Sequence, residues 1–128
     1  MQNRWVRFEH AGQIGFGTLS GDQVHAHRGD MFGISEATGT VLALADVKLL
    51  SPSAPTKVIA LWNNFHALGA KLNLPVPLEP MYLLKSPNSF SAHGEAIRPP
   101  RCDGKVVFEG ELGIVIGTKA RYVTEADA

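Results

Sequence analysis

Residues 106–117 read Val-Val-Phe-Glu-Gly-Glu-Leu-Gly-Ile-Val-Ile-Gly, a run that is apolar and rich in β-branched side chains apart from its two glutamates. Such a composition is typical of a central β-strand. Because side chains alternate across a strand, Glu109 and Glu111 are expected on the same face. Two like charges side by side in apolar surroundings are costly, and a divalent cation with oxygen ligands would offset that cost. The alternative is a solvated edge strand that carries two acids without a metal.

The overall composition is that of a globular protein. The chain has 128 residues, of which 45% are hydrophobic and 19% charged, and its formal net charge is zero. One domain, or one domain with a small appendage, is expected for this length. The absence of a basic excess argues against nucleic acid as a partner, and no apolar stretch approaches the ~20 residues of a membrane span. The single cysteine, Cys102, allows no internal disulfide, and the first residues lack a secretory signal, so a reducing cytoplasmic location is expected.

The N-terminal part of the chain is predicted to consist of short β-strands separated by turns. Four segments have the required composition, namely residues 4–8, 13–19, 23–27 and 47–50. The stretch over residues 51–56, Ser-Pro-Ser-Ala-Pro-Thr, has the composition of a linker. We therefore predict a small β-rich N-terminal domain over residues 1–51 and a second domain over residues 52–128.

The second domain begins with an apolar strand over residues 57–62. Asn63 or Asn64 is a suitable N-cap for a short helix that reaches about Leu72, because apolar side chains recur every three or four residues on it. Prolines exclude regular structure between this helix and a further strand over residues 81–85. The predicted fold class is therefore mainly β, of the α+β type.

The end of the sequence has the pattern of a helix start. Thr124 is followed three residues later by Asp127, which is the arrangement of a capping residue and an acid in the first turn. Such a start so close to residue 128 suggests the front part of a longer protein. A frayed C-terminus is the alternative, since cap patterns also occur in turns.

These segments together resemble the N-terminal part of the fumarylacetoacetate hydrolase family. The resemblance runs from about Val58 to Ala128, and the Glu-x-Glu-Leu run that ends in glycine is its most specific part. Residues 1–51 are similar, more loosely, to the small N-terminal domain of bacterial members. The motifs that carry the resemblance occur in the family's order at residues 58–66, 77–87, 97–100, 108–117 and 120–128.

The resemblance implies a mixed β-sandwich roll of which residues 52–128 form the first, incomplete part. It implies that Glu109 and Glu111 bind Mg²⁺ or Mn²⁺, with a third ligand, an aspartate, beyond residue 128. The catalytic histidine of the family corresponds to His66, for which a helix-face histidine with a satisfied hydrogen bond is the alternative interpretation. Lys85 matches a lysine that would steady the site or a substrate carboxylate, although a solvated lysine at a strand end is an equal interpretation.

The sequence departs from the family's pattern around the histidine. Ala60, Trp62 and Asn63 stand where the family has glycine, asparagine and tyrosine, and Gly69 stands where it has a glutamate. In hydrolytic and decarboxylating members that glutamate pairs with the histidine to activate water. Without it, isomerisation is easier to support than hydrolysis of a C–C bond.

The resemblance implies a metal-dependent enzyme of aromatic catabolism whose substrate is a small enolisable keto acid, such as a 2-hydroxydienoate or acylpyruvate-like dicarboxylate. A divalent ion would stabilise the enolate, and His66 would move a proton near neutral pH. An isomerase or decarboxylase is preferred, a C–C bond hydrolase is the alternative, and family members are commonly homodimers. A third hypothesis is a non-catalytic β-rich interaction module, or an inactive fragment, in which the glutamate pair is structural.

Overall fold

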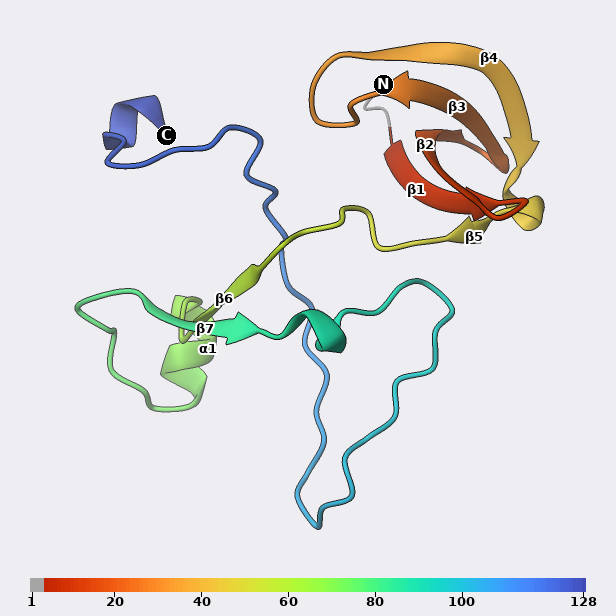
Figure 1. Cartoon of the computed structure of the whole chain (residues 1–128). Helices are drawn as coiled ribbons and strands as arrows, with labels where there is room; N and C mark the ends of the chain where they lie inside the picture. The colour runs from red at the N-terminus through yellow and green to blue at the C-terminus, as the bar shows by residue number, and fades with distance from the viewer. Residues whose placement is uncertain (1–3) are drawn as a thin grey trace. The chain divides into compact units, whose positions relative to one another are not determined.

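A computed structural model describes residues 4–128 of the chain and divides them into two compact units. The first unit comprises residues 4–53 and 93–128, and the second comprises residues 54–92 (Figure 1). Each unit is built from antiparallel strands, so the predicted mainly β character is confirmed. The boundary predicted between residues 51 and 52 stays a prediction.

The first unit contains a five-stranded antiparallel sheet with the strand order β4-β3-β2-β1-β5, which curves strongly in Figure 1. A short 3₁₀ helix at Leu44–Asp46 joins the last two strands. The four predicted strands are confirmed, although the fourth is reduced to two residues. The bounds are β1 (Arg4–His10), β2 (Gln13–Ser20), β3 (Gln23–Gly29), β4 (Ser35–Ala43) and β5 (Lys48–Leu49).

Tight hairpin turns fix the register of the first three strands. Between β1 and β2, Ala11 and Gly12 have φ angles of 49° and 75°, the combination that a type I′ turn requires. Between β2 and β3, Gly21 has a φ of 59° at the first central position, which glycine adopts without strain. The hairpin signals in the sequence are therefore realised where they were expected.

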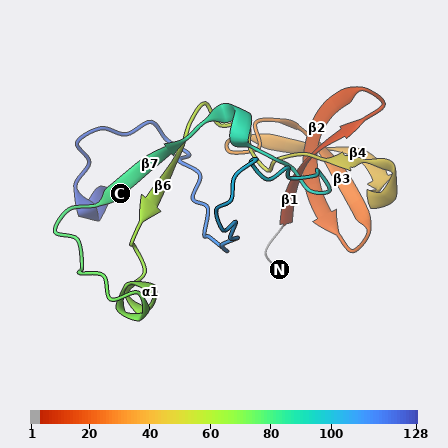
Figure 2. The same cartoon turned by 90° about the horizontal axis from the view of Figure 1, so that it is seen from below.

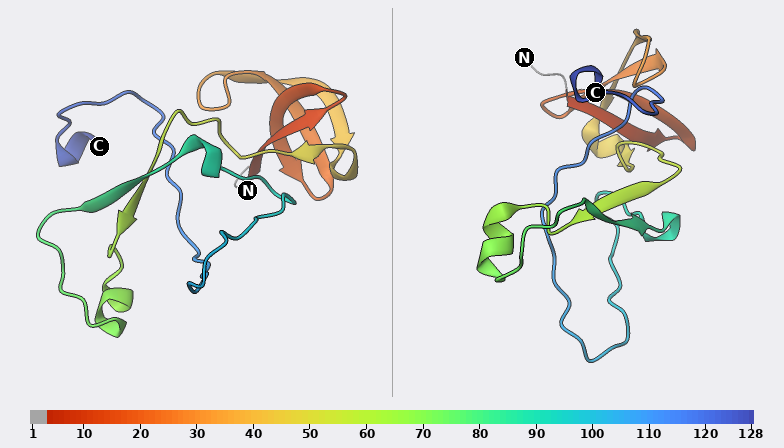
Figure 3. Two further views of the ribbon diagram at one scale, coloured as in Figure 1. Left: turned by 60° about the horizontal axis from the view of Figure 1, so that its bottom comes forward. Right: turned by 90° about the vertical axis from the view of Figure 1, so that its left-hand side faces the viewer.

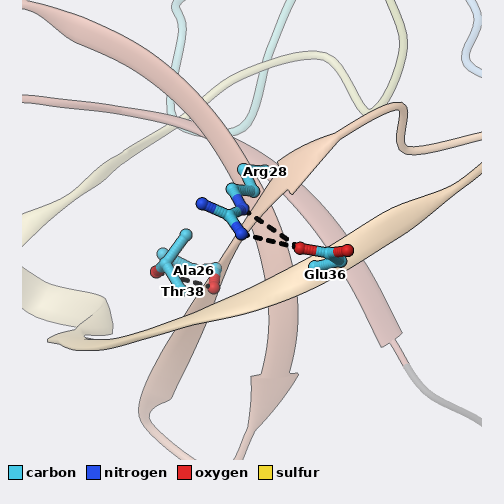
Figure 4. A network of polar contacts seen from close by, with 4 residues as sticks. All are labelled: Ala26, Arg28, Glu36 and Thr38. Atoms are coloured by element: carbon cyan, nitrogen blue, oxygen red, sulfur yellow. Dashed lines mark hydrogen bonds and ion pairs between the residues drawn. The ribbon is translucent and has the colours of Figure 1, made fainter.

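Strand β4 was not predicted from the sequence. It pairs with β3 in two stretches, and a bulge between them sets residues 38–40 opposite Ala26. Gly39 lies in the bulge with a φ of 82°, and the Thr38 hydroxyl donates a 3.0 Å hydrogen bond to the carbonyl of Ala26 (Figure 4). A glycine inside a strand weakens the alternating pattern by which strands are recognised, and it commonly marks a bulge.

The hydrophobic core of the first unit is small and lies on one face of the sheet. Among the described residues, the buried apolar side chains are Phe8, with 4% exposed, and Val24, with 0% exposed. Phe8 is paired with Gly15, where an added Cβ would lie 3.0 Å from the Phe8 ring. Gly15 therefore leaves the space that the ring fills.

The second unit is a two-stranded antiparallel ribbon with one short helix. It contains β6 (Val58–Trp62), α1 (His66–Lys71), β7 (Met81–Lys85) and a 3₁₀ turn at Pro87–Ser89. Figure 2 shows the two strands side by side, with α1 following β6. Both predicted strands and the helix are confirmed. At six residues α1 is the longest helix between residues 4 and 128, and no helix there is long and apolar enough to cross a membrane.

The predicted N-cap of α1 is wrong. The helix begins at His66 with Phe65 in the capping position, and no side chain caps it. Asn63 instead has a φ of 52°, a left-handed conformation that asparagine tolerates better than most residues. It directs the chain out of β6, and its side-chain amide donates to the carbonyl of Pro75 instead of capping the helix.

Residues 106–117 form no strand, contrary to the prediction from their composition. Every residue of this segment is exposed, including Phe108 at 98% and Leu112 at 83%. A strand requires a neighbour that shares its backbone hydrogen bonds, and no strand within residues 4–128 pairs with this segment. Glu109 and Glu111 are therefore exposed to solvent. Because they are not buried here, no cation is needed to offset a cost of burial.

The helix start expected at Thr124 is a single 3₁₀ turn over Glu125–Asp127. The Thr124 hydroxyl donates to Oδ2 of Asp127 at 2.6 Å, and the Asp127 amide donates to the Thr124 carbonyl at 3.1 Å. The side-chain pattern thus makes the local contact that its spacing predicts. A capping pattern closes one turn by itself, while a longer helix needs further residues and packing.

Candidate active site

His66 is the first residue of α1, and residues 63–65 connect it to the end of β6. Its side chain is exposed, and it makes no hydrogen bond or ion pair with any residue from 4 to 128. The alternative of a helix-face histidine with a satisfied hydrogen bond is therefore not supported. An exposed imidazole is free to exchange protons with a bound molecule.

The Asn63 side chain lies against the inner face of α1. Its amide nitrogen Nδ2 donates a 2.9 Å hydrogen bond to the carbonyl of Pro75, which follows the helix in sequence. Its Oδ1 lies where a Cβ added at Gly69 would approach it to 2.8 Å, which is closer than Cβ atoms come in proteins. Gly69 is the buried residue of α1. The helix therefore packs on Asn63 through a position that has no side chain.

The segment after α1 returns to this contact. The Leu74 amide donates to the Gly69 carbonyl at 2.9 Å, and Asn73 reverses the chain with a φ of 55°. Together with the Asn63–Pro75 bond, these contacts hold both ends of α1. This arrangement has no clear signal in the sequence, although asparagine directly after a strand is a common choice for a left-handed turn.

Lys85 is the last residue of β7 and pairs with Val58, the first residue of β6. The opposite end of the ribbon, Trp62 paired with Met81, leads into α1. The two ends of the five-residue strand are four residue steps apart, a distance of about 13 Å. Figure 3 shows α1 following the far end of β6. The strand register thus sets Lys85 at the opposite end of the ribbon from the segment that carries His66.

Glu109 and Glu111 lie in the first unit, on exposed backbone without regular structure. Within the described part of the chain, neither carboxylate forms an ion pair or a hydrogen bond. Carboxylate oxygens are the ligands that Mg²⁺ and Mn²⁺ prefer, and Mg²⁺ is often held by one or two carboxylates together with water and substrate. The donor chemistry of the pair thus fits such an ion. No group of three or more potential ligands occurs within residues 4–128.

Two family models match the chain, one on each side of the linker. The N-terminal domain of Rv2993c-like proteins matches residues 3–52, and the fumarylacetoacetate hydrolase C-terminal domain matches residues 57–128. The second match covers every residue predicted for the site. These residues are His66, Lys85, Glu109 and Glu111.

Curated relatives include enzymes with named activities. The mitochondrial oxaloacetate tautomerase fahd2 of Xenopus laevis is 34% identical over 89 residues, which is 69% of this chain and 28% of that protein. The bifunctional isomerase/decarboxylase of 4-hydroxyphenylacetate degradation from Salmonella dublin is 36% identical over 76 residues, which is 59% of this chain and 18% of that protein. The chain spans about a third of the length of the curated relatives that it matches first.

A solved structure shares the fold. The crystal structure of 2-hydroxyhepta-2,4-diene-1,7-dioate isomerase from Mycobacterium marinum superposes with a TM-score of 0.56 at 23% identity. The superposition covers 69% of this chain and 34% of that one. At this level of identity the likeness concerns the fold alone.

Proposed function

This chain belongs to the fumarylacetoacetate hydrolase family, and we propose that the protein is a metal-dependent enzyme that isomerises an enolisable 2-oxo acid. The observation that carries the proposal is the contact between Gly69 and Asn63. His66 is exposed at the start of α1, and Gly69, one helical turn further on, offers no carboxylate. A proton carrier without a paired acid suits tautomerisation better than attack by water.

The proposed reaction moves one proton and breaks no carbon–carbon bond. In the direction from enol to ketone, His66 accepts the proton of the enol hydroxyl and returns a proton to the neighbouring carbon, so the imidazole ends in its starting state. No water is consumed and nothing is released, so the reaction needs no activated nucleophile. The exposed imidazole supports this role because a histidine ring nitrogen can accept a proton and later donate it.

Glu109 and Glu111 are the residues proposed to hold Mg²⁺ or Mn²⁺. Both are exposed and carry no competing ion pair within residues 4–128, and their oxygen donors suit either ion. When bound, such an ion would supply positive charge beside the oxygens of the 2-oxo acid, where negative charge develops. The two carboxylates would hold the ion, and water or further groups would complete its coordination.

The proposed substrate class follows from the chemistry and from the relatives. A 2-oxo acid carries a carbonyl and a carboxylate side by side, and its α-carbon can lose a proton. The matching Xenopus relative is named an oxaloacetate tautomerase, which supports a 2-oxo dicarboxylate and an isomerase. The Salmonella relative is named an isomerase/decarboxylase, so loss of CO₂ from a related substrate is the neighbouring activity to test.

A comparison of two substrates tests the proposal. The protein is expressed from its complete gene and supplied with Mg²⁺. The ketonisation of enol oxaloacetate and the hydrolysis of an acylpyruvate are then followed by ultraviolet absorbance. We expect kcat/KM for ketonisation to exceed that for hydrolysis by about 100-fold or more. Hydrolysis needs a general base that activates water, and such a base usually contributes a factor of this size. Acylpyruvate hydrolysis with an equal or higher kcat/KM contradicts the proposal.

A further inference from the structure

We infer that Asn63 is a positioning residue for His66, and that its amide occupies the space which an acid on α1 would need. The inference rests on the proposed function, since it explains why this chain would transfer protons without activating water. Asn63 touches none of the reacting atoms in this account. It acts through the placement of α1 and of the histidine at its start.

The backbone at Asn63 sets the path of the chain from β6 into α1. Asn63 directly follows β6, and its left-handed φ of 52° turns the chain toward the helix. A six-residue helix is too short to be stable by itself in water, so its placement depends on tertiary contacts. The turn at Asn63 therefore decides where His66 begins the helix.

The side chain of Asn63 links the segments before and after α1. Nδ2 of Asn63 donates to the carbonyl of Pro75 at 2.9 Å, and the Leu74 amide donates to the carbonyl of Gly69 at 2.9 Å. Asn63, three residues before His66, is thereby tied to the segment after the helix. Removal of the amide breaks this link, while the backbone bond between Leu74 and Gly69 remains.

Position 69 of α1 lies against the Asn63 side chain. Residues three apart are neighbours on a helix surface, so a side chain at position 69 would lie one turn from His66. A Cβ there would approach Oδ1 of Asn63 to 2.8 Å, and a carboxylate would additionally set acceptor oxygens against that acceptor. The hydrogen bond to Pro75 opposes movement of the amide. An acid at position 69 would therefore have to displace the Asn63 side chain from its present place.

The chemical consequence is that the helical turn after His66 carries no carboxylate, because position 69 is a glycine. A neighbouring carboxylate would favour the protonated imidazole and help it to take a proton from water. The Asn63 amide carries no charge and spends its donor on Pro75. The arrangement therefore supports a proton shuttle, as tautomerisation requires, and gives no assistance to hydrolysis.

The experiment compares two asparagines that share a backbone conformation. Asn63→Gly keeps the left-handed turn and removes the amide. Asn73→Gly makes the same change at the other end of α1, where φ is 55° and the side chain has no hydrogen bond within the described residues. In the complete protein we expect Asn63→Gly to lower kcat for enol oxaloacetate by about 10- to 100-fold, the cost of a misplaced catalytic group, with KM nearly unchanged. Asn73→Gly is expected to stay near wild type.

Two further readouts separate positioning from general instability. In a His66→Gln background, Asn63→Gly is expected to cause no additional loss, because both changes act through the same group. In samples labelled with ¹⁵N-histidine, the His66 imidazole signals are expected to shift in Asn63→Gly and in Asn63→Asp but not in Asn73→Gly. Equal effects of Asn63→Gly and Asn73→Gly on kcat and on these signals overturn the inference, as does an undiminished loss in the His66→Gln background. If wild type ketonises no 2-oxo acid, the proposed function fails, and the imidazole signals still decide the placement by Asn63.

Discussion

Oδ1 of Asn63 lies so close to Gly69 that a Cβ at position 69 would be 2.8 Å from the oxygen. The pair lies within one turn of His66, because Gly69 is three residues further along α1. This contact distinguishes the helix from one that carries an acid beside the histidine. The effect of Gly69→Ala on stability should therefore depend on whether the Asn63 side chain is present.

Gly69→Ala is predicted to destabilise the second unit in the wild-type background and to stabilise it when Asn63 is replaced by Gly. In wild type the new methyl group meets Oδ1, at a cost of about 1–3 kcal/mol for overpacking. In the Asn63→Gly background that oxygen is absent, and alanine is favoured over glycine in a helix by about 1 kcal/mol. Urea unfolding of the four variants measures both values. A destabilisation of the same size in both backgrounds contradicts the contact.

Gly15→Ala is predicted to destabilise the N-terminal sheet by about 1–3 kcal/mol, because it overpacks a core site. The added Cβ would lie 3.0 Å from the Phe8 ring, which is one of the buried side chains of that sheet. Gly113→Ala is the matched control, since nothing lies within 4 Å of a Cβ at that position. Thermal unfolding followed by circular dichroism compares the two. A change no greater than that of the control would show that the ring does not fill the space above Gly15.

The ion pair between Arg28 and Glu36 is predicted to contribute little to stability. The guanidinium contacts Oε2 of Glu36 at 2.8 and 3.2 Å, but the side chains are 75% and 64% exposed (Figure 4). Exposed pairs of this kind contribute about 0.2–1 kcal/mol. A double-mutant cycle with Arg28→Ala and Glu36→Ala in urea measures the coupling, which should also weaken in salt. A coupling of several kcal/mol would contradict the prediction.

Residues 106–117 of the 128-residue chain are predicted to exchange their amide hydrogens much faster than β1–β3. Within the described residues they have no ladder partner, and all of them are exposed. The hairpins of the N-terminal sheet have paired backbones and the buried residues Phe8 and Val24. Hydrogen exchange read by mass spectrometry compares the two regions directly. Equal protection of both would mean that the segment is paired in solution.

The parts of the fold that the sequence predicts are those with local signals. The hairpin at Ala11 and Gly12 is encoded in the turn itself, and the order of β6, α1 and β7 follows from their apolar patterns and the prolines between them. Strand β4 escaped prediction because Gly39 and its bulge interrupt the alternation. The strand expected over residues 106–117 fails for a different reason, since composition favours a strand but pairing depends on distant segments.

The candidate site divides in the same way. The motif over residues 58–66 identifies His66 as the candidate catalytic histidine. The structure adds that its side chain is exposed and has no partner among residues 4–128. The contact between Asn63 and Gly69 could not be foreseen, because asparagine after a strand also suggests a helix cap. Glu109 and Glu111 do not lie on a strand in the described residues. Their role as metal ligands stays a prediction, as does the catalytic role of Lys85.

We propose that a divalent ion on Glu109 and Glu111 supports proton transfer to a 2-oxo acid. The most direct measurement is the rate of enol oxaloacetate ketonisation after the complete protein has been treated with a chelator and then supplied with Mg²⁺ or Mn²⁺. Wild type and Asp103→Asn, which changes an exposed acid of the same unit, are expected to recover by about 100-fold or more, as several kcal/mol of charge stabilisation implies. Glu109→Gln/Glu111→Gln is expected to stay at the metal-free rate. Full recovery of the double variant, or an unchanged rate in metal-free wild type, would contradict the account.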